Sequence, residues 1–218
     1  HMKIGIIGSG IVGQTLVKGL AKHKFEVMIS TGSAEKQVEL QMDVGKQIRV
    51  GAFEDAAAYG EVVILAVKGA AAEGIVTKLA DELSSKIVID TTNPIDESIP
   101  PQDGVLTYFT KAGESLMQRL QATAPQAQFV KAFNSVGAGV MVDPEFAVRP
   151  TMHICGDHES AKKTVGDLLD KLGWDVCDLG TAHAASAVES LCILWCITGF
   201  RDNDWSHAYA LLHTEARD

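Results

Sequence analysis

Hydrophobic residues in the first two thirds of the chain fall in short blocks separated by amphipathic stretches. The blocks at Val62–Val67 and Ile87–Asp90 are continuous rather than alternating, which is typical of parallel strands buried on both faces. Strand and helix patterns alternate along the chain, which predicts a parallel sheet covered by helices on both sides. The expected strands are Ile4–Ile7, Phe25–Ser30, Ile48–Val50, Val62–Val67, Ile87–Asp90 and Phe129–Ala132, and the expected helices are Val12–Lys22, one that begins in Glu35–Gln41, Ala70–Leu83 and Glu114–Gln121.

The alternation continues beyond the sixth strand and then stops. The remaining expected elements are strands at Thr151–Cys155 and Asp175–Leu179, a helix at Ser160–Leu172 between them, an apolar helix at Ala182–Phe200 and a last short helix at Trp205–His213. The predicted fold class is therefore α/β, a doubly wound, mostly parallel sheet with extra strands and a short helical C-terminal segment. We expect one sheet domain over residues 2–180 and the helical segment over residues 181–218.

Charge and hydropathy exclude several classes of function. The formal net charge of −9 disfavours nucleic acid and anionic lipid as partners, and no run of Lys and Arg offsets it locally. The longest apolar stretch, Ala184–Phe200, is shorter than the roughly 20 residues of a membrane span and contains Glu189. It is apolar on every side, and few residues remain to cover it, so we expect a buried or dimer-facing helix and a homodimer.

Neither the start of the sequence nor its cysteines indicate secretion. His1–Met2 resembles the remnant of a cleaved tag, and the first strand pattern begins directly after it, without a signal sequence. The four cysteines show no framework spacing, which favours reduced thiols and a cytoplasmic location.

The first turn reads Gly8-Ser9-Gly10-Ile11-Val12-Gly13, a G-x-G-x-x-G motif between a predicted strand and a predicted helix. Gly8 permits the tight turn, Gly10 lets the backbone approach a diphosphate, and Gly13 lets the helix pack closely on the strand. The free N–H groups of the helix N-terminus would hold the phosphates. Because strand, helix and second strand all lie where the motif requires them, we infer a dinucleotide site.

The end of the second strand indicates which dinucleotide binds. NAD enzymes usually place Asp or Glu here, whereas this chain reads Ser-Thr-Gly-Ser over residues 30–33. Thr31 and Ser33 can donate hydrogen bonds to a 2′-phosphate and Lys36 can add charge, which favours NADP. The simpler interpretation is that Ser33 caps the following helix, and both can hold.

Two later loops follow strands at the edge where ligands bind in open sheets. The first loop comprises Ala66, Val67 and Lys68, and the second comprises Asp90-Thr91-Thr92-Asn93-Pro94. We expect both loops to line the cofactor site, although Asn93-Pro94 is equally compatible with a plain turn.

These motifs occur in the same order in a known family. The glycine turn, Val62–Val67, Asp90–Pro94 and the Lys-Ala-Phe-Asn-Ser segment Lys131–Ser135 resemble the NADP-dependent oxidoreductases of the coenzyme F420 type. That family includes archaeal NADPH:F420 reductases and the cytosolic domain of six-transmembrane metalloreductases. The resemblance covers nearly the whole chain and implies a Rossmann domain, a short C-terminal portion and a homodimer.

The resemblance also implies roles for individual residues. It implies hydride transfer between NADPH and a deazaflavin or flavin stacked on the nicotinamide, so the acceptor is a small molecule. This chain departs from the archaeal pattern at Gly32, where arginine is usual. The implied cofactor residues are Gly8, Ser9, Gly10, Ile11 and Val12 at the diphosphate, Thr31 at the 2′-phosphate, and Ala66, Lys68 and Asn93 at the nicotinamide ribose, while Asn134, Ser135, Gly137 and Ala138 would shape the floor where the rings meet.

Other functions remain open at this stage. Hydride transfer to a flavin-like ring requires alignment rather than acid–base catalysis, which agrees with our finding no catalytic residue in the sequence. An imine or small-carbonyl reductase of the pyrroline-carboxylate or hydroxyacid type is the alternative. Carbonyl reduction requires a proton donor, and no lysine follows Lys171. A sensing module that binds NADP(H) without turnover is the third possibility.

Single residues of the apolar helix invite several interpretations. Cys192 and Cys196 stand one turn apart, but small buried residues explain them better than a metal site, and we expect no metal. Glu189 would bind a ligand, pair across a dimer or occupy a hydrated stripe. Trp195 would either line the acceptor pocket or pack in the core or a dimer interface.

Overall fold

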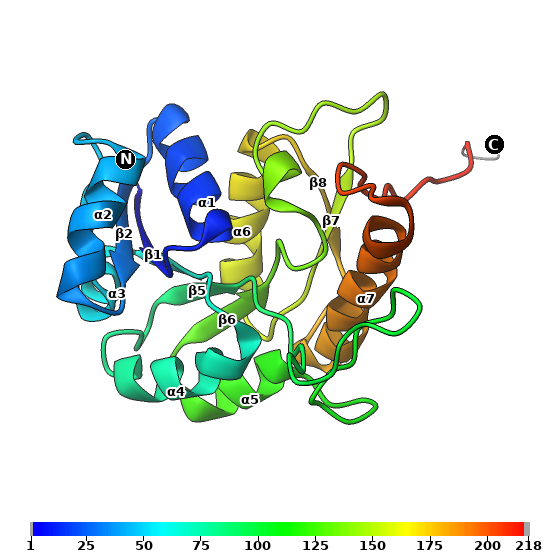
Figure 1. Ribbon diagram of the computed structural model, residues 1–218, viewed down its shortest axis with the longest axis horizontal. Coiled ribbons are helices and arrows are strands. Elements are labelled where there is room, and N and C mark those ends of the chain that lie inside the picture. Colours follow the sequence, from blue (N-terminus) through cyan, green and yellow to red (C-terminus); the bar gives the residue numbers. More distant parts are fainter. Residues whose placement is uncertain (1, 216–218) are drawn as a thin grey trace.

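A computed structural model describes residues 2–215 of the chain and shows a doubly wound α/β fold (Figure 1). Six parallel strands form the main sheet in the order β3-β2-β1-β4-β5-β6. Their bounds are β1 Lys3–Ile7, β2 Glu26–Thr31, β3 Arg49–Ala52, β4 Val62–Leu65, β5 Ile87–Asp90 and β6 Gln128–Lys131. The chain order reverses between β1 and β4, which is the switch point where such sheets bind ligands.

Helices cover both faces of this sheet, and each face has its own hydrophobic core (Figure 1). Ile4 and Ile6 of β1 point into one core and Ile7 into the other, because successive side chains of a strand alternate in direction. The first core lies under α1 Ile11–Lys22, α2 Ala34–Val44 and α6 Glu159–Lys171, and the second under α3 Phe53–Tyr59, α4 Gly69–Leu79 and α5 Leu116–Thr123.

The additional strands form a separate sheet. β7 Thr151–Ile154 and β8 Asp175–Asp178 pair in parallel with each other. Backbone pairing with β6 is limited to an isolated antiparallel bridge, in which Lys131 N donates to Cys155 O at 3.0 Å. Two single turns of 3₁₀-helix, Ala138–Val140 and Ala182–Ala184, and helix α7 Ala185–Asp202 complete the regular structure of residues 2–215.

The structure differs from the sequence-based expectation at two elements. Helix α3 was not expected; Asp55 stabilises its start by accepting a hydrogen bond from Ala52 N at 2.9 Å. The expected helix at Trp205–His213 is wrong, because this stretch has no helical turn. Its backbone binds β7 instead, where Tyr209 O accepts from Thr151 N and Leu211 N donates to Thr151 Oγ1, both at 2.9 Å.

Helix α7 combines buried and exposed apolar residues. Among the described residues 2–215, one helical stretch, Ala182–Asp202, is long and apolar enough to cross a membrane. Its 21 residues exceed the apolar run Ala184–Phe200 on which the sequence-based expectation rested. Val188 and Trp195 are buried, whereas Leu194 and Phe200 are about half exposed. The helix packs against α5, and its own Glu189 is buried in an ion pair, so we interpret it as part of the folded domain.

Candidate dinucleotide site

The three motif glycines have different surroundings. At Gly8, φ is +119° and a Cβ would lie 2.1 Å from Ala66 O; at Gly13 a Cβ would lie 2.4 Å from Gly8 O. The fold itself therefore requires glycine at these two positions. Gly10 has an ordinary φ of −73° and no heavy atom within 4 Å of a Cβ built there, so the fold does not require glycine at this position.

A cavity of about 650 Å³ extends over the carboxyl ends of β1, β2, β4 and β5. The N-terminus of α1 opens into it, and Gly10, the N-cap residue of this helix, has no side chain to cap the free N–H groups. Free N–H groups and the helix dipole make this end suited to an anion. Among the residues expected at the cofactor, Gly8, Ser9, Gly10, Ile11, Val12, Thr31, Lys36, Ala66, Val67, Lys68 and Asn93 line this cavity, whereas Gly13, Ser33, Pro94 and Ala138 do not.

The end of β2 contributes hydroxyl groups and a cation. The Thr31 hydroxyl accepts a hydrogen bond from Ser9 Oγ at 3.1 Å, which joins the glycine turn to the second strand. Ser33 is the N-cap of α2, and its hydroxyl accepts from Lys36 N at 3.3 Å. The capping interpretation of Ser33 is thus confirmed, while Lys36 and Gly32 lie at the cavity wall.

Several residues of the cavity wall were missed from the sequence. Phe53 and Ile75 are apolar residues of α3 and α4, and nothing in their local pattern separates them from core residues. Thr91 and Thr92 belong to the loop expected at the site after β5, although they were not named individually as cofactor residues. The wall residues not named individually are Gly32, Phe53, Gly69, Ala70, Ala71, Ile75, Thr91, Thr92, Ile95 and Glu97.

The residues expected at the acceptor lie beside this cavity rather than in its wall. Asn134 and Ser135 are buried, and the side chains of Asn93 and Asn134 are joined: Asn93 Nδ2 donates to Asn134 O at 2.8 Å, and Asn134 Nδ2 donates to Asn93 Oδ1 at 3.1 Å. Gly137 lies against Trp195, where a Cβ would be 2.9 Å from the indole.

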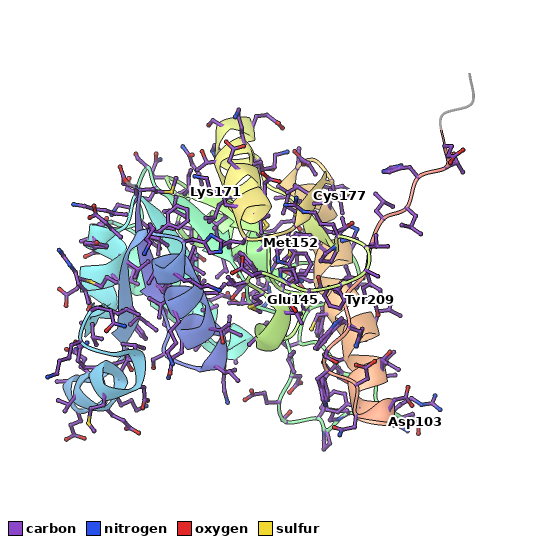
Figure 2. All side chains as sticks on the ribbon, turned by 90° about the horizontal axis from the view of Figure 1, so that it is seen from above. Asp103, Glu145, Met152, Lys171, Cys177 and Tyr209 are labelled. Carbon is purple, nitrogen blue, oxygen red and sulfur yellow. The ribbon has the colours of Figure 1, made fainter. Side chains whose placement is uncertain are left out.

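Trp195 itself is covered by the segment that follows α7. Its ring stacks on His207 with centroids 4.8 Å apart, and its Nε1 donates to His207 O at 2.8 Å. Figure 2 shows this segment running past Tyr209 along α7. Trp195 therefore has a packing role in this structure.

Comparison with known proteins agrees with this geometry. A family model described as "NADP oxidoreductase coenzyme F420-dependent" matches residues 3–94, from β1 to the loop after β5. The crystal structure of a proposed F420-dependent NADP reductase from Arthrobacter sp. FB24 is 30% identical, with a TM-score of 0.90 over 98% of this chain and 100% of that chain. The chain belongs to this family.

Two curated relatives show the range of this F420-dependent oxidoreductase family. The F420-dependent NADP reductase of Methanocaldococcus jannaschii is 27% identical over 87% of this chain and 89% of its own length. Metalloreductase STEAP3 of Rattus norvegicus is also 27% identical over 87% of this chain, but the matched part spans only 36% of the metalloreductase. The chain is thus an NADP-dependent oxidoreductase of this family, and its acceptor is a separate question.

The structure decides one further interpretation of α7 and gives the geometry of its two cysteines. Glu189 is 1% exposed, and its carboxylate binds Lys131 Nζ at 2.8 Å, so the hydrated-stripe interpretation is wrong. Cys192 and Cys196 place their Sγ atoms 3.9 Å apart. Within the described part of the chain, no three His, Cys, Asp or Glu residues are grouped as metal ligands.

Proposed function

We propose that this family member binds NADPH in the 650 Å³ cavity and transfers a hydride to a deazaflavin or flavin-like ring. The observation that carries the proposal is the order in which polar and charged groups are arranged along the cavity. In the strand order β2-β1-β4-β5, Thr31 and Lys36 follow β2 on one side, Gly10 and the N-terminus of α1 follow β1, and Asn93 follows β5 on the other side; all of them line the cavity. This order matches a 2′-phosphate, a diphosphate and a nicotinamide ribose.

Each part of the cavity then has a defined task. The backbone of Gly8–Val12 binds the diphosphate, and Thr31, Ser33 and Lys36 favour the 2′-phosphate over a free hydroxyl. Ser33 contributes by holding the start of α2, since its side chain caps this helix. Ala66, Val67, Lys68, Asn93 and Pro94 form the nicotinamide side.

We place the acceptor beside Asn134, Ser135, Gly137 and Ala138, whereas Trp195 is left out of the proposal because it packs against His207. NADPH supplies the hydride when bound, and the protein aligns the two rings and excludes water. Relatives whose names specify F420-dependent NADP reduction support a deazaflavin. The metalloreductase relative, of which 36% is matched, is the reason to include a ferric chelate among the acceptors tested.

The experiment is a steady-state screen of NADPH oxidation against coenzyme F420, FMN, FAD, a ferric chelate and a small cyclic imine. Turnover with F420 or a flavin, and slower turnover with NADH than with NADPH, is the expected result. Turnover of the imine alone would replace the proposal with an imine reductase. Tight NADPH binding without oxidation by any acceptor would replace it with a sensing module.

We also propose that two copies associate through α7, as expected from its apolar sequence. Leu194 is 54% exposed and Phe200 46% exposed on this helix, and a second copy packed against α7 would cover apolar surface that is otherwise in contact with water. Light scattering at micromolar concentration should give twice the mass of the chain, and a monomer would refute the association. The expected cytoplasmic location stays a prediction.

A further inference from the structure

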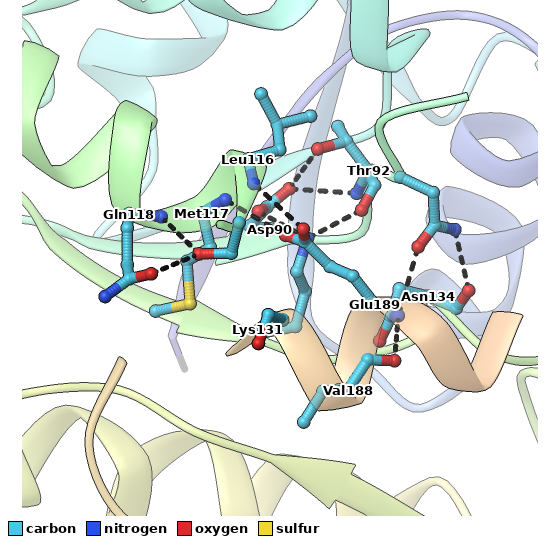
Figure 3. A network of polar contacts seen from close by, with 12 residues as sticks. Asp90, Thr92, Leu116, Met117, Gln118, Lys131, Asn134, Val188 and Glu189 are labelled. Carbon is cyan, nitrogen blue, oxygen red and sulfur yellow. Dashed lines mark hydrogen bonds and ion pairs between the residues drawn. The ribbon is translucent and has the colours of Figure 1, made fainter. Parts of the chain in front are cut away.

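Lys131 is a fully buried cation with three acceptors (Figure 3). Its Nζ lies 2.8 Å from Asp90 Oδ2, 2.6 Å from Thr92 O and 2.8 Å from Glu189 Oε2. An ammonium has three N–H donors, so every one of them is used. Burial alone would lower the pKa of Lys131, but the carboxylates of Asp90 and Glu189 outweigh it and raise the pKa, so the group stays charged.

Glu189 connects this cation to two helices. It belongs to α7, and its carboxylate oxygens also accept from Leu116 N at 2.8 Å and Met117 N at 3.0 Å, the first two residues of α5. The positive end of the α5 dipole thereby offsets the extra negative charge of two carboxylates around one ammonium. Helix α7 is consequently anchored to β6 and α5 through one side chain.

Thr92, which lines the cavity, is held by this network on both sides. Its N–H and hydroxyl donate to Asp90 Oδ1 at 2.9 and 2.6 Å, and its carbonyl accepts from Lys131. The next residue, Asn93, is held through Asn134, whose Nδ2 also donates to Val188 O of α7 at 2.9 Å. Two adjacent residues of the cavity wall therefore depend on neighbouring residues of α7.

We propose that Lys131 and Glu189 are positioning residues that fix the Thr92–Asn93 turn for the nicotinamide half of NADPH. The inference rests on the proposed function. The adenosine half belongs at the end of β2, on one side of the glycine turn, and the Thr92–Asn93 turn follows β5 on the other side. A wall fixed before binding lowers the ordering cost of the ligand half that it touches and leaves the other half unaffected.

The test compares two ligands, NADPH and adenosine 2′,5′-bisphosphate, which lacks the nicotinamide half. In Glu189→Gln and Lys131→Met the Kd of NADPH should rise about tenfold, which is about 1.4 kcal/mol. The Kd of the bisphosphate should stay within about twofold of the wild type, because its binding groups lie at β2. Thr92→Val removes only the hydroxyl bond to Asp90 and serves as the milder variant if the other two do not fold; it should show the same selective loss, about threefold.

Lys162→Met is the matched control. Lys162 is 3% exposed and also has three acceptors: Asp178 Oδ1 at 2.9 Å, Glu159 Oε1 at 3.0 Å and Gly180 O at 3.1 Å. It lies in the α6–β8 region, outside the cavity wall. This variant should lower the melting temperature but leave the Kd of both ligands unchanged.

The outcomes distinguish a positioning role from a general loss of stability, and a failure of this inference from a failure of the proposed function. Equal weakening of both ligands in the folded variants, or no weakening of either, would overturn the positioning role. If the wild type binds both ligands and Thr92→Val and Glu189→Gln bind NADPH like the wild type, only this inference fails. If the wild type binds neither ligand, the proposed function fails and the inference with it.

Discussion

Gly10→Ala tests the dinucleotide site with little effect on the fold. No heavy atom lies within 4 Å of the added Cβ, and φ at Gly10 is −73°, which alanine adopts without strain. Alanine is a poorer N-cap than glycine, but it also restricts the unfolded chain, and the two effects oppose each other at about 0.5–1 kcal/mol each. We therefore expect the free energy of unfolding to change by less than about 1 kcal/mol.

Binding should change much more than stability. The added methyl group occupies the space in front of the α1 N-terminus, where the backbone must approach the diphosphate. Inserting a methyl group into a close contact costs about 1–3 kcal/mol, so the Kd of NADPH should rise about 5- to 150-fold. The increase should be similar for NADH, because both dinucleotides contain the diphosphate.

The measurements are a calorimetric or fluorescence titration with NADPH and a thermal melt of the same preparation. Gly74→Ala is the control: it lies inside α4, also with no heavy atom within 4 Å of the added Cβ, and outside the cavity wall. It should gain up to about 1 kcal/mol of stability and bind NADPH normally. A Gly10→Ala variant that melts like the wild type and binds NADPH with unchanged Kd would refute the diphosphate assignment.

Three more predictions address the packing, the specificity and the thiols. Gly13→Ala places a Cβ 2.4 Å from Gly8 O and should destabilise the fold by about 3 kcal/mol, lowering Tm by about 6–12 °C in a thermal melt. Lys36→Ala should weaken NADPH about fivefold and leave NADH unchanged in parallel titrations, and equal effects on both would contradict a 2′-phosphate contact. Burial raises the pKa of the Cys155 thiol to about 12, so at pH 8 this thiol should react with a thiol reagent only after unfolding. The partly exposed Cys177 should react in the native protein. Mass spectrometry of the labelled peptides distinguishes the two cysteines.

The main sheet could be predicted from the sequence because its strands are buried on both faces. Their central positions form continuous apolar runs, as in Val62–Leu65, and this pattern is visible locally. Helix α3 was missed because it has seven residues and its N-cap residue, Ala52, has no capping side chain. The segment Trp205–His213 was misassigned because its backbone partner, Thr151, is more than 50 positions away and no local pattern encodes it.

In the candidate site, too, the features with a local sequence signal were predicted and those that depend on distant contacts were not. The glycine turn and the loops after β4 and β5 were predicted because a turn motif and the ends of strands are local signals. The meaning of Glu189 was not, since its partners Lys131 and Leu116 lie on other elements and only the folded chain joins them. Phe53 and Ile75 have apolar side chains that fit a core and a cavity wall equally well.

The bridge between β6 and the segment after β7 has a consequence for self-association. Lys131 N at the β6 edge is bonded to Cys155 O, and Gly156 passes so close that a Cβ would lie 2.6 Å from Phe129 O. This edge is therefore closed to a further strand. The other edge of the six-stranded sheet is β3, whose outer backbone groups pair with no further strand. This edge is protected because β3 has only four residues and carries the charge of Arg49. Edge-to-edge aggregation of the native protein should thus begin at β3, and variants that remove the charge of Arg49 are the ones that should precipitate first.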